Sequence, residues 1–474
     1  MAVRARSRRR PAPWLSLLLL MALLACLGSL HPANRPPTGR VFTPQGPAAG
    51  ALVSPPLRSE IAVTTGRDGT YHPPPSHQPP WIVALQGHYL AATRGGPVHL
   101  EPVPEDHPET QWINPAPGTS PRACGSCHPA ALDQWLGSPH QRSAAGPLFS
   151  ALLTPDIRKI QKPSPWRLAE NYPEASAACV ACHAPGASSL EAELPAAGIL
   201  GGTHCDLCHK VKDLGPGTLG LTHGRDLFIL ARPAPGGRPV VLGPLPDSTR
   251  ENVAYSPLYK QSLFCAPCHE GVVLGAPVYT SFSEWQAWGG NQSCQDCHMP
   301  ADGARHHHHG MTAQLARKQG GLRTEWSVQR TPTATRVRLS LRSEKVGHAL
   351  PTGHVDRHIV GWLEARDADG KPLAPLERSD MLEPWFTGMD HSVPGFLLAR
   401  WQEKERPGPT PFWSPGGTWR DTRLLPDQPR ELEWLFSPEV RSFHLRVEHR
   451  IAWPAMLQSL DLPLQGQVLV DETK

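Results

Sequence analysis

Hydrophobic and polar residues alternate along the last third of the chain. The segment 337–342 reads Val-Arg-Leu-Ser-Leu-Arg, and the segment 443–451 keeps the same period of two. Such alternation predicts β-strands that bury one face and expose the other. A third apolar segment, 358–366, ends shortly before the turn signal Asp369-Gly370. Residues 322–474 are therefore predicted to form an antiparallel β-sandwich domain.

The part of the chain that precedes this domain has weaker patterns. Residues 34–80 are rich in proline, and the segments 81–90 and 97–103 have the composition of short strands. We expect residues 34–110 to form a small β-rich module. The segment 129–136 (Pro-Ala-Ala-Leu-Asp-Gln-Trp-Leu) is predicted to be one of several helical pieces further along the chain. The predicted fold class is α+β.

The composition indicates a chain with many loops. Proline (55 residues) and glycine (42 residues) make about a fifth of the 474 residues, near the level at which regular secondary structure becomes sparse. The 15 tryptophans and 39% apolar residues supply material for a core and argue against disorder. A loop-rich chain wrapped around another group fits this composition.

The N-terminus has the features of an export signal. Five arginines between positions 4 and 10 precede an apolar run over 14–30. The run contains Leu-Ala-Cys ending at Cys26, which resembles the lipobox of bacterial lipoproteins, so lipidation of Cys26 would anchor the mature protein to a membrane. The alternatives are cleavage at a nearby small residue or an uncleaved, marginally short anchor helix. We therefore predict that residues 1–33 direct export to the periplasm or the outer cell surface.

The formal net charge of +4 gives little information about partners. Removal of the signal takes away five arginines and leaves the mature chain nearly neutral. Because no strongly basic surface is predicted, neither nucleic acid nor an anionic surface is an expected partner.

The cysteines form a regular pattern. Of 11 cysteines, Cys26 lies in the signal, and the other ten fall in five C-x-x-C-H motifs with none left over. In such a motif two thiols form thioethers with the vinyl groups on one edge of a haem, and the following histidine becomes the proximal iron ligand. The motifs are Cys124/Cys127/His128, Cys179/Cys182/His183, Cys205/Cys208/His209, Cys265/Cys268/His269 and Cys294/Cys297/His298.

Other uses of paired cysteines explain the pattern less well. Zinc ribbons need paired C-x-x-C knuckles, and five is an odd number with no reason for a histidine after every second cysteine. A disulfide within C-x-x-C is usually catalytic and would not recur five times. The motifs therefore predict five covalently attached haem c groups.

The five motifs fall within residues 111–321, which we predict to be a loop-rich, partly helical domain wrapped around the five haems. The pair His183 and His209 resembles the pair His269 and His298 in spacing. This indicates duplication of a two-haem unit behind one leading haem. Short gaps favour neighbouring haems, so we expect a chain in which each haem lies close to the next.

The second axial ligand decides what each iron can do. A second histidine gives an iron suited to electron transfer, whereas an open position can bind a small molecule. His140 is a candidate because it follows the predicted helix, and His348 would let the β-domain reach back to a haem. The remaining candidates are the run His306, His307, His308 and His309, for which free metal binding is an alternative, together with His223 and His204.

The sequence around these residues resembles a known family. The stretches CGSCHPAALDQWLGSPH, HCDLCHKV, YSPLYKQSLFCAPCHEG, SFSEWQAWGGNQSCQDCHMP and VGHALPTG lie within residues 122–365. They are similar to those of multihaem c-type cytochromes related to the tetrahaem cytochrome c that accepts electrons from hydroxylamine oxidoreductase. The resemblance implies electron transfer, with distal ligands at His140, at His348 and within 306–309.

One departure from the family pattern concerns a distal ligand. Relatives often carry a histidine shortly before the Tyr-Ser-Pro-Leu stretch, but residues 247–254 contain none. Either His223 substitutes for it, or one haem lacks a distal ligand from the protein.

Three functions are compatible with the sequence. The first is an exported electron carrier between a donor and an acceptor redox protein. The second is an oxidoreductase that acts on a small nitrogen or sulfur compound at one open haem, although no C-x-x-C-K motif marks a special catalytic haem. The third is a conducting or docking component of a larger surface redox complex, because the β-domain is larger than a haem clamp requires.

Overall fold

The computed structural model describes residues 38–73, 77–153, 164–172, 176–187, 201–301, 305–311, 321–377, 380–387, 390–414 and 416–474. The predicted export signal with Cys26 lies outside these residues. The chain divides into two compact units, Met1–Val103 with Leu245–Tyr255, and Pro104–Pro244 with Ser256–Lys474. Within the described residues, none of the helices combines the length and the hydrophobicity that a membrane crossing requires.

The first unit contains two four-stranded sheets. One consists of β1 (Gly39–Thr43), β2 (Gly46–Pro47), β5 (Thr70–Tyr71) and β8 (Pro97–His99). The other consists of β3 (Leu52–Ser54), β4 (Val63–Thr64), β6 (Trp81–Ala84) and β7 (Ala91–Thr93). The short 3-10 helix η1 (Ser59–Ile61) and the strand β12 (Val253–Tyr255) belong to the same unit.

Residues from both sheets of this unit share one apolar core. Val41 and Val98 from the first sheet pack with Val53 and Trp81 from the second. Strands β6 and β8 lie within the two segments predicted to be strands, but each is shorter than its segment. In the case of β6, Gly87 adopts a positive φ of 77° in a turn and ends the extended run.

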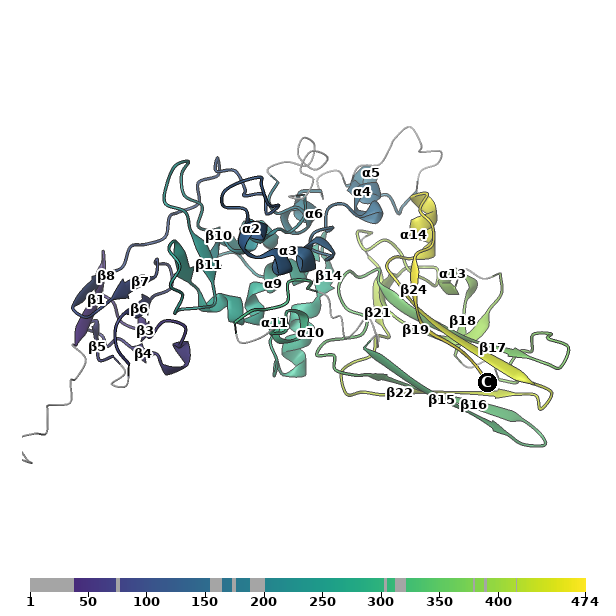
Figure 1. Ribbon diagram of the computed structural model, residues 1–474. Coiled ribbons are helices and arrows are strands. Elements are labelled where there is room, and N and C mark those ends of the chain that lie inside the picture. The colour runs from purple at the N-terminus through teal and green to yellow at the C-terminus, as the bar shows by residue number, and fades with distance from the viewer. Residues whose placement is uncertain are drawn as a thin grey trace, which may run out of the picture. The chain divides into compact units, whose positions relative to one another are not determined.

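The predicted haem-binding region, which in the second unit comprises residues 111–244 and 256–321, consists of short elements joined by loops (Figure 1). Its α-helices are α2 (Cys124–Cys127), α3 (Pro129–Leu136), α4 (Pro147–Leu153), α5 (Leu168–Asn171), α6 (Ser176–His183), α8 (Cys205–Cys208), α9 (Ala266–His269), α10 (Ser281–Trp288) and α11 (Cys294–His298). The predicted helix over 129–136 is confirmed as α3.

Small strands and 3-10 helices connect these helices. The strands β9 (Val211–Leu214) and β10 (Phe228–Leu230) form one antiparallel pair, and β13 (Glu270–Val273) and β14 (Ala276–Thr280) form another. The other elements are η5 (Gly224–Leu227), β11 (Val241–Gly243), η6 (Pro257–Lys260) and η7 (Ser262–Phe264).

The β-domain, residues 322–474 of the second unit, contains a three-stranded sheet and a five-stranded sheet (Figure 1). The first has the order β15 (Leu322–Arg330), β16 (Thr335–Ser343) and β22 (Arg430–Phe436). The second has the order β18 (Met381–Leu382), β19 (Val393–Leu398), β17 (His358–Arg366), β23 (Ser442–Arg450) and β24 (Gly466–Thr473). The remaining elements are β20 (Arg400–Glu403), β21 (Thr418–Asp421), α13 (Pro384–Thr387) and α14 (Pro454–Ser459).

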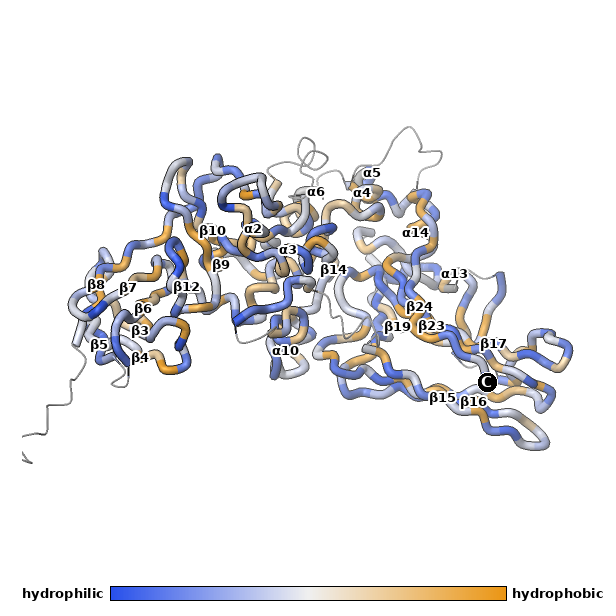
Figure 2. The backbone as a smooth tube through the Cα atoms, viewed as in Figure 1, coloured by the Kyte–Doolittle hydropathy of each residue, from blue (hydrophilic) through white to orange (hydrophobic). Residues whose placement is uncertain are grey.

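The two sheets of the β-domain share a core built from the alternating residues. Leu339 of β16 and Trp434 of β22 pack in one apolar core with Leu363 of β17 and Leu445 of β23. Figure 2 shows hydrophobic and hydrophilic positions interleaved along these strands. The strands predicted over 337–342, 358–366 and 443–451 are therefore confirmed.

Candidate functional site

Each C-x-x-C-H motif lies on a short helix or at its end. Cysteines three residues apart fall on the same face of a helical turn, so both thiols can reach one edge of a macrocycle. In α8 the His204 imidazole accepts a hydrogen bond from the N–H of Leu207 and caps the helix. In α11, Ser293 and Asp296 form a capping box. None of the ten motif cysteines, all within the described residues, is in a disulfide.

Thiols from different motifs lie next to one another. The neighbouring pairs are Cys124 with Cys205, Cys182 with Cys268, and Cys265 with Cys294. The first motif therefore adjoins the third, and the fourth adjoins both the second and the fifth. The short gaps predicted that the second motif adjoins the third and the fourth adjoins the fifth. The three thiol pairs include the latter neighbourhood but not the former, and spacing gave no indication of the other two contacts.

Three proximal histidines face a second histidine. The ring centroids are 6.1 Å apart for His269 and His140, 6.5 Å for His209 and His309, and 6.3 Å for His298 and His348. A metal–imidazole bond of about 2 Å on each side of an iron places two ring centroids roughly 6 Å apart. Each pair therefore fits an iron held between two imidazoles.

Backbone carbonyls orient the rings of two proximal histidines. Nδ1 of His183 lies 2.9 Å from the carbonyl oxygen of Ser143, and Nδ1 of His209 lies 2.7 Å from that of Leu242. A proton on Nδ1 lets the ring donate to the carbonyl and leaves the lone pair on Nε2 for a metal. The protein thus selects the tautomer that haem ligation requires.

Burial keeps the paired imidazoles neutral. It is the largest cause that lowers the pKa of His140 to about 4 and that of His269 to about 3, with smaller contributions from neighbouring histidines. Burial likewise lowers the pKa of His309 to about 4, and it lowers the pKa of His298 and His348. Since a metal binds only the unprotonated ring, these sites stay competent for ligation at neutral pH.

His183 has different surroundings. Its Nε2 lies 3.1 Å from the hydroxyl of Tyr279, and its ring stacks on Phe149 with centroids 4.8 Å apart. Tyr279 in turn contacts the ring of His354 edge to face at 5.5 Å. Nδ1 of His354 accepts a hydrogen bond from the N–H of Asp356 at 3.3 Å, so the neutral ring carries its proton on Nε2. In the described part of the chain, a phenol lies at the His183 nitrogen that would bind iron.

The four consecutive histidines do not act as one group. His309 faces His209, whereas His306 and His307 are exposed. His308 uses Nδ1 to accept a hydrogen bond from the N–H of Gly310 at 3.1 Å. Within the described ranges, no group of three or more His, Cys, Asp or Glu side chains is arranged to hold a free metal ion.

The other predicted ligands lie close to the motifs. His223 lies beside Gly271, just after the fourth motif, and its buried Nε2 has no hydrogen-bond partner in the described structure. A buried ring nitrogen without a partner is costly unless it binds something, which fits a metal ligand. His128 lies close enough to His309 to contribute to the lowered pKa of that ring.

Sequence reasoning missed three residues at these sites. Tyr279 lies at the end of β14, where a tyrosine in a strand gives no sign of a nearby ligand. Met311 contacts Nδ1 of His140 through its sulfur. Glu284 fits the S-x-x-E pattern of a capping box with Ser281. This pattern explains the residue locally and gives no indication of its contacts with the β-domain.

Comparisons with known proteins agree with the motifs. The family model described as cytochrome c554 and c-prime matches residues 123–210. The structure is similar to that of a penta-heme cytochrome c552 from Thermochromatium tepidum, with a TM-score of 0.55, 20% identity, and coverage of 74% of this chain and 97% of that chain. Both findings support a multihaem c-type cytochrome. No curated protein matches the sequence.

The same findings support covalently bound haem c and electron transfer, which implies redox protein partners. The family match includes the first three motifs, from Cys124 to His209. The similarity to the cytochrome c552 extends over most of the chain and concerns the fold, since the identity is 20%.

Proposed function

We propose that this multihaem cytochrome is an exported electron carrier that holds five haems and passes electrons between a donor and an acceptor protein. The observation that carries the proposal is the set of three facing imidazole pairs at 6.1, 6.3 and 6.5 Å. An iron held by two imidazoles changes its oxidation state with little rearrangement. Such an iron is suited to electron transfer rather than to substrate binding.

The arrangement of the motifs supports a connected set of haems. The fourth motif adjoins the second and the fifth, and the first adjoins the third. The fourth motif also lies near the third, because the Cys208 thiol contributes to the raised pKa of Cys265 and of Cys268. The haems would carry the redox chemistry, and the protein would set their spacing and their potentials through ligands and burial.

Export is proposed from the N-terminal sequence. The arginines and the apolar run over 14–30 have the order of a secretory signal, and covalent haem attachment takes place after secretion. Lipidation of Cys26 would hold the carrier at a membrane surface. Replacement of Cys26 by serine would then release the protein into the soluble periplasmic fraction.

The number of haems can be tested by mass. The purified, denatured protein should exceed its mature polypeptide mass by five haems, and the reduced protein should show c-type absorption bands. A matched series with both cysteines of one motif replaced by alanine should lose one haem per motif. A gain of fewer than five haems in the unmodified protein would contradict the proposal.

A second candidate function is favoured by the surroundings of His183. The Tyr279 hydroxyl lies 3.1 Å from His183 Nε2, with the His354 N–H donor behind it. The positive charge of Arg357 contributes to the lowered pKa of both His183 and His354. Donors of this kind stabilise a small oxyanion. The haem attached at this motif would then bind a small nitrogen or sulfur compound instead of a second imidazole.

Electron paramagnetic resonance of the oxidised protein separates the two candidates. A pure carrier gives low-spin signals for every haem, whereas an open haem gives one stoichiometric high-spin signal. Tyr279→Phe should alter the high-spin signal and its response to added nitrite, and Tyr255→Phe serves as the matched control. An entirely low-spin spectrum would contradict the second candidate and leave the carrier in place.

A further inference from the structure

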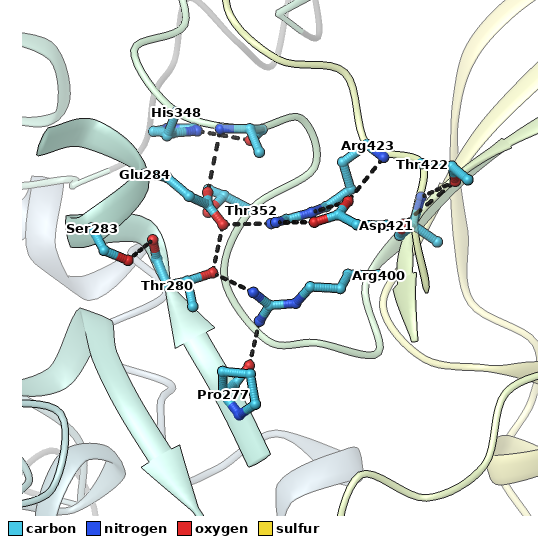
Figure 3. Close-up of polar contacts among 12 residues, drawn as sticks. Pro277, Thr280, Ser283, Glu284, His348, Thr352, Arg400, Asp421, Thr422 and Arg423 are labelled. Atoms are coloured by element: carbon cyan, nitrogen blue, oxygen red, sulfur yellow. Dashed lines mark hydrogen bonds and ion pairs between the residues drawn. The ribbon is translucent and has the colours of Figure 1, made fainter. Parts of the chain in front are cut away.

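The carboxylate of Glu284 forms hydrogen bonds with the loop that carries His348 (Figure 3). Glu284 lies on α10 in the haem-binding region. Its Oε2 accepts a hydrogen bond from the Thr352 hydroxyl at 2.7 Å and another from the N–H of Ala349 at 3.2 Å. The two hydrogen bonds fix the loop at the residue that follows His348 and again at Thr352.

The same carboxylate is neutralised from the β-domain. Arg423 donates a hydrogen bond to Oε1 of Glu284 at 2.5 Å, and the two side chains are only 8% and 12% exposed. Asp421 binds the other side of this guanidinium at 2.9 and 2.7 Å. Burial alone would lower the pKa of Arg423, but its hydrogen bonds and charge interactions with Asp421 and Glu284 outweigh this and raise it.

A second arginine, Arg400, contacts Glu284 indirectly through Thr280. Arg400 donates to the Thr280 hydroxyl at 2.8 Å and to the carbonyl oxygen of Pro277, both in the haem-binding region. Thr280 then donates to Oε1 of Glu284 at 2.5 Å. Glu284 therefore accepts four hydrogen bonds, which saturates the lone pairs of a carboxylate.

The loop is also tied to the segment that carries Arg423. Leu350 and Leu424 exchange two backbone hydrogen bonds at 2.8 and 3.0 Å. Nδ1 of His348 lies 3.0 Å from the carbonyl oxygen of Ala349, so the ring donates there and directs its Nε2 lone pair elsewhere. The orientation of the His348 ring thus depends on the backbone that Glu284 holds.

We propose that Glu284 is a positioning residue that keeps His348 at the distal side of the haem attached through Cys294 and Cys297. The proposal rests on the proposed ligation of that haem by His298 and His348. Two features give it physical force. The carboxylate is buried and accepts four hydrogen bonds, which fixes its position, and from α10 it contacts the loop through two of them.

The effect of a substitution follows from these contacts. In Glu284→Ala the loop loses both hydrogen bonds to Oε2, and Arg423 keeps Asp421 as its only described carboxylate partner. His348 should then leave the iron in part of the molecules. In Glu284→Gln the amide oxygen can still accept from Thr352 and Ala349, but the amide nitrogen faces Arg423, so a smaller effect is expected.

The experiment compares these variants in the intact haem-loaded protein by electron paramagnetic resonance and by redox titration. His348→Ala identifies the low-spin signal of the haem in question. Glu284→Ala should lose the same signal in part and gain high-spin iron, and added imidazole should restore low-spin iron. Glu433→Ala is the matched control, because Glu433 likewise forms ion pairs with arginine side chains of the β-domain, two of them at 2.9 and 2.7 Å, but is 47% exposed.

The outcomes separate the possible failures. An unchanged spectrum and unchanged potentials in Glu284→Ala, with all haems present, would overturn the proposal. Where Glu284→Ala does not fold, wild-type potentials and signals in Glu284→Gln would overturn it instead. No spin change in His348→Ala would refute ligation by His348, whereas a wild-type mass below five haems would refute the proposed function itself.

Discussion

The rings of His298 and His348 lie 6.3 Å apart at their centroids, and their planes are inclined by only 18°. His298 ends α11 in the haem-binding region, and His348 lies in the loop between β16 and β17. The β-domain therefore brings an imidazole next to the histidine of a C-x-x-C-H motif. If the two rings hold one iron, as proposed above, a domain without cysteines influences the potential of that haem.

Replacement of His348 by methionine should raise the potential of one haem. A His/Met pair favours ferrous iron more than a bis-His pair does, and axial ligands change haem potentials on the order of 0.1 V or more. Redox titration followed by optical spectroscopy should resolve one component that moves upward. His444→Met is the control, because His444 is part of β23 and pairs with Asp471 at the surface of the same domain. A shift of equal size in the control would contradict the assignment.

Only one histidine of the run 306–309 should act as an axial ligand of a haem. His309→Ala should convert one low-spin haem to high spin, because His309 faces His209 at 6.5 Å. His306→Ala and His307→Ala should leave the spectrum unchanged, since both side chains are exposed. Electron paramagnetic resonance of the three variants provides the comparison. If the spectrum changes most in His306→Ala, the assignment of His309 as the ligand is wrong.

Local patterns predicted the parts of the fold whose residues interact with near neighbours. The strand at 337–342 could be recognised because a period of two places Val337, Leu339 and Leu341 on one face, and all three are buried. The helix over 129–136 was predicted from its local sequence and is confirmed as α3, whereas the helices at the motifs themselves were not predicted.

The pairing of distant residues could not be predicted in this way. Which of His306 to His309 faces His209 depends on the tertiary fold, as does the contact of Cys182 with Cys268. Glu284 shows the same limit. It accepts a hydrogen bond from the nearby Thr280, as its sequence context indicates, but Arg423 and Thr352 lie far along the chain.

Truncation of Leu339 should destabilise the β-domain. The side chain is 1% exposed and belongs to the core shared by the two sheets. Leu339→Ala should lower the free energy of unfolding by about 2–5 kcal/mol, the range for a buried leucine that leaves a cavity. The neighbouring Arg338→Ala changes an exposed residue of the same strand and should cost about 0.5 kcal/mol or less. Urea denaturation of both variants gives the measurement.

Asp356 should make stability depend on pH. Burial raises the pKa of its carboxyl from 3.8 to about 7, although a hydrogen bond from Trp453 acts in the opposite direction. Between these two values the folded protein holds a proton at Asp356 that the unfolded chain has released, so this carboxyl contributes a fall in the free energy of unfolding as pH rises. Its contribution to the slope should approach about 1.4 kcal/mol per pH unit in this window, and buried histidines with a lowered pKa contribute with the opposite sign.

Asp356→Asn should remove this contribution, because an amide of the same shape is neutral in both states, so the free energy of unfolding should rise more steeply with pH in the variant than in wild type. Denaturation midpoints at several pH values between about 4 and 7 provide the measurement. Asp471→Asn is the control: the hydrogen bond with His444 lowers the pKa of Asp471 below 3.8, so its carboxylate is ionised in both states over most of the window. Because only a group with a raised pKa can produce a fall of stability here, an equal slope in wild type and Asp356→Asn would exclude Asp356 as its source.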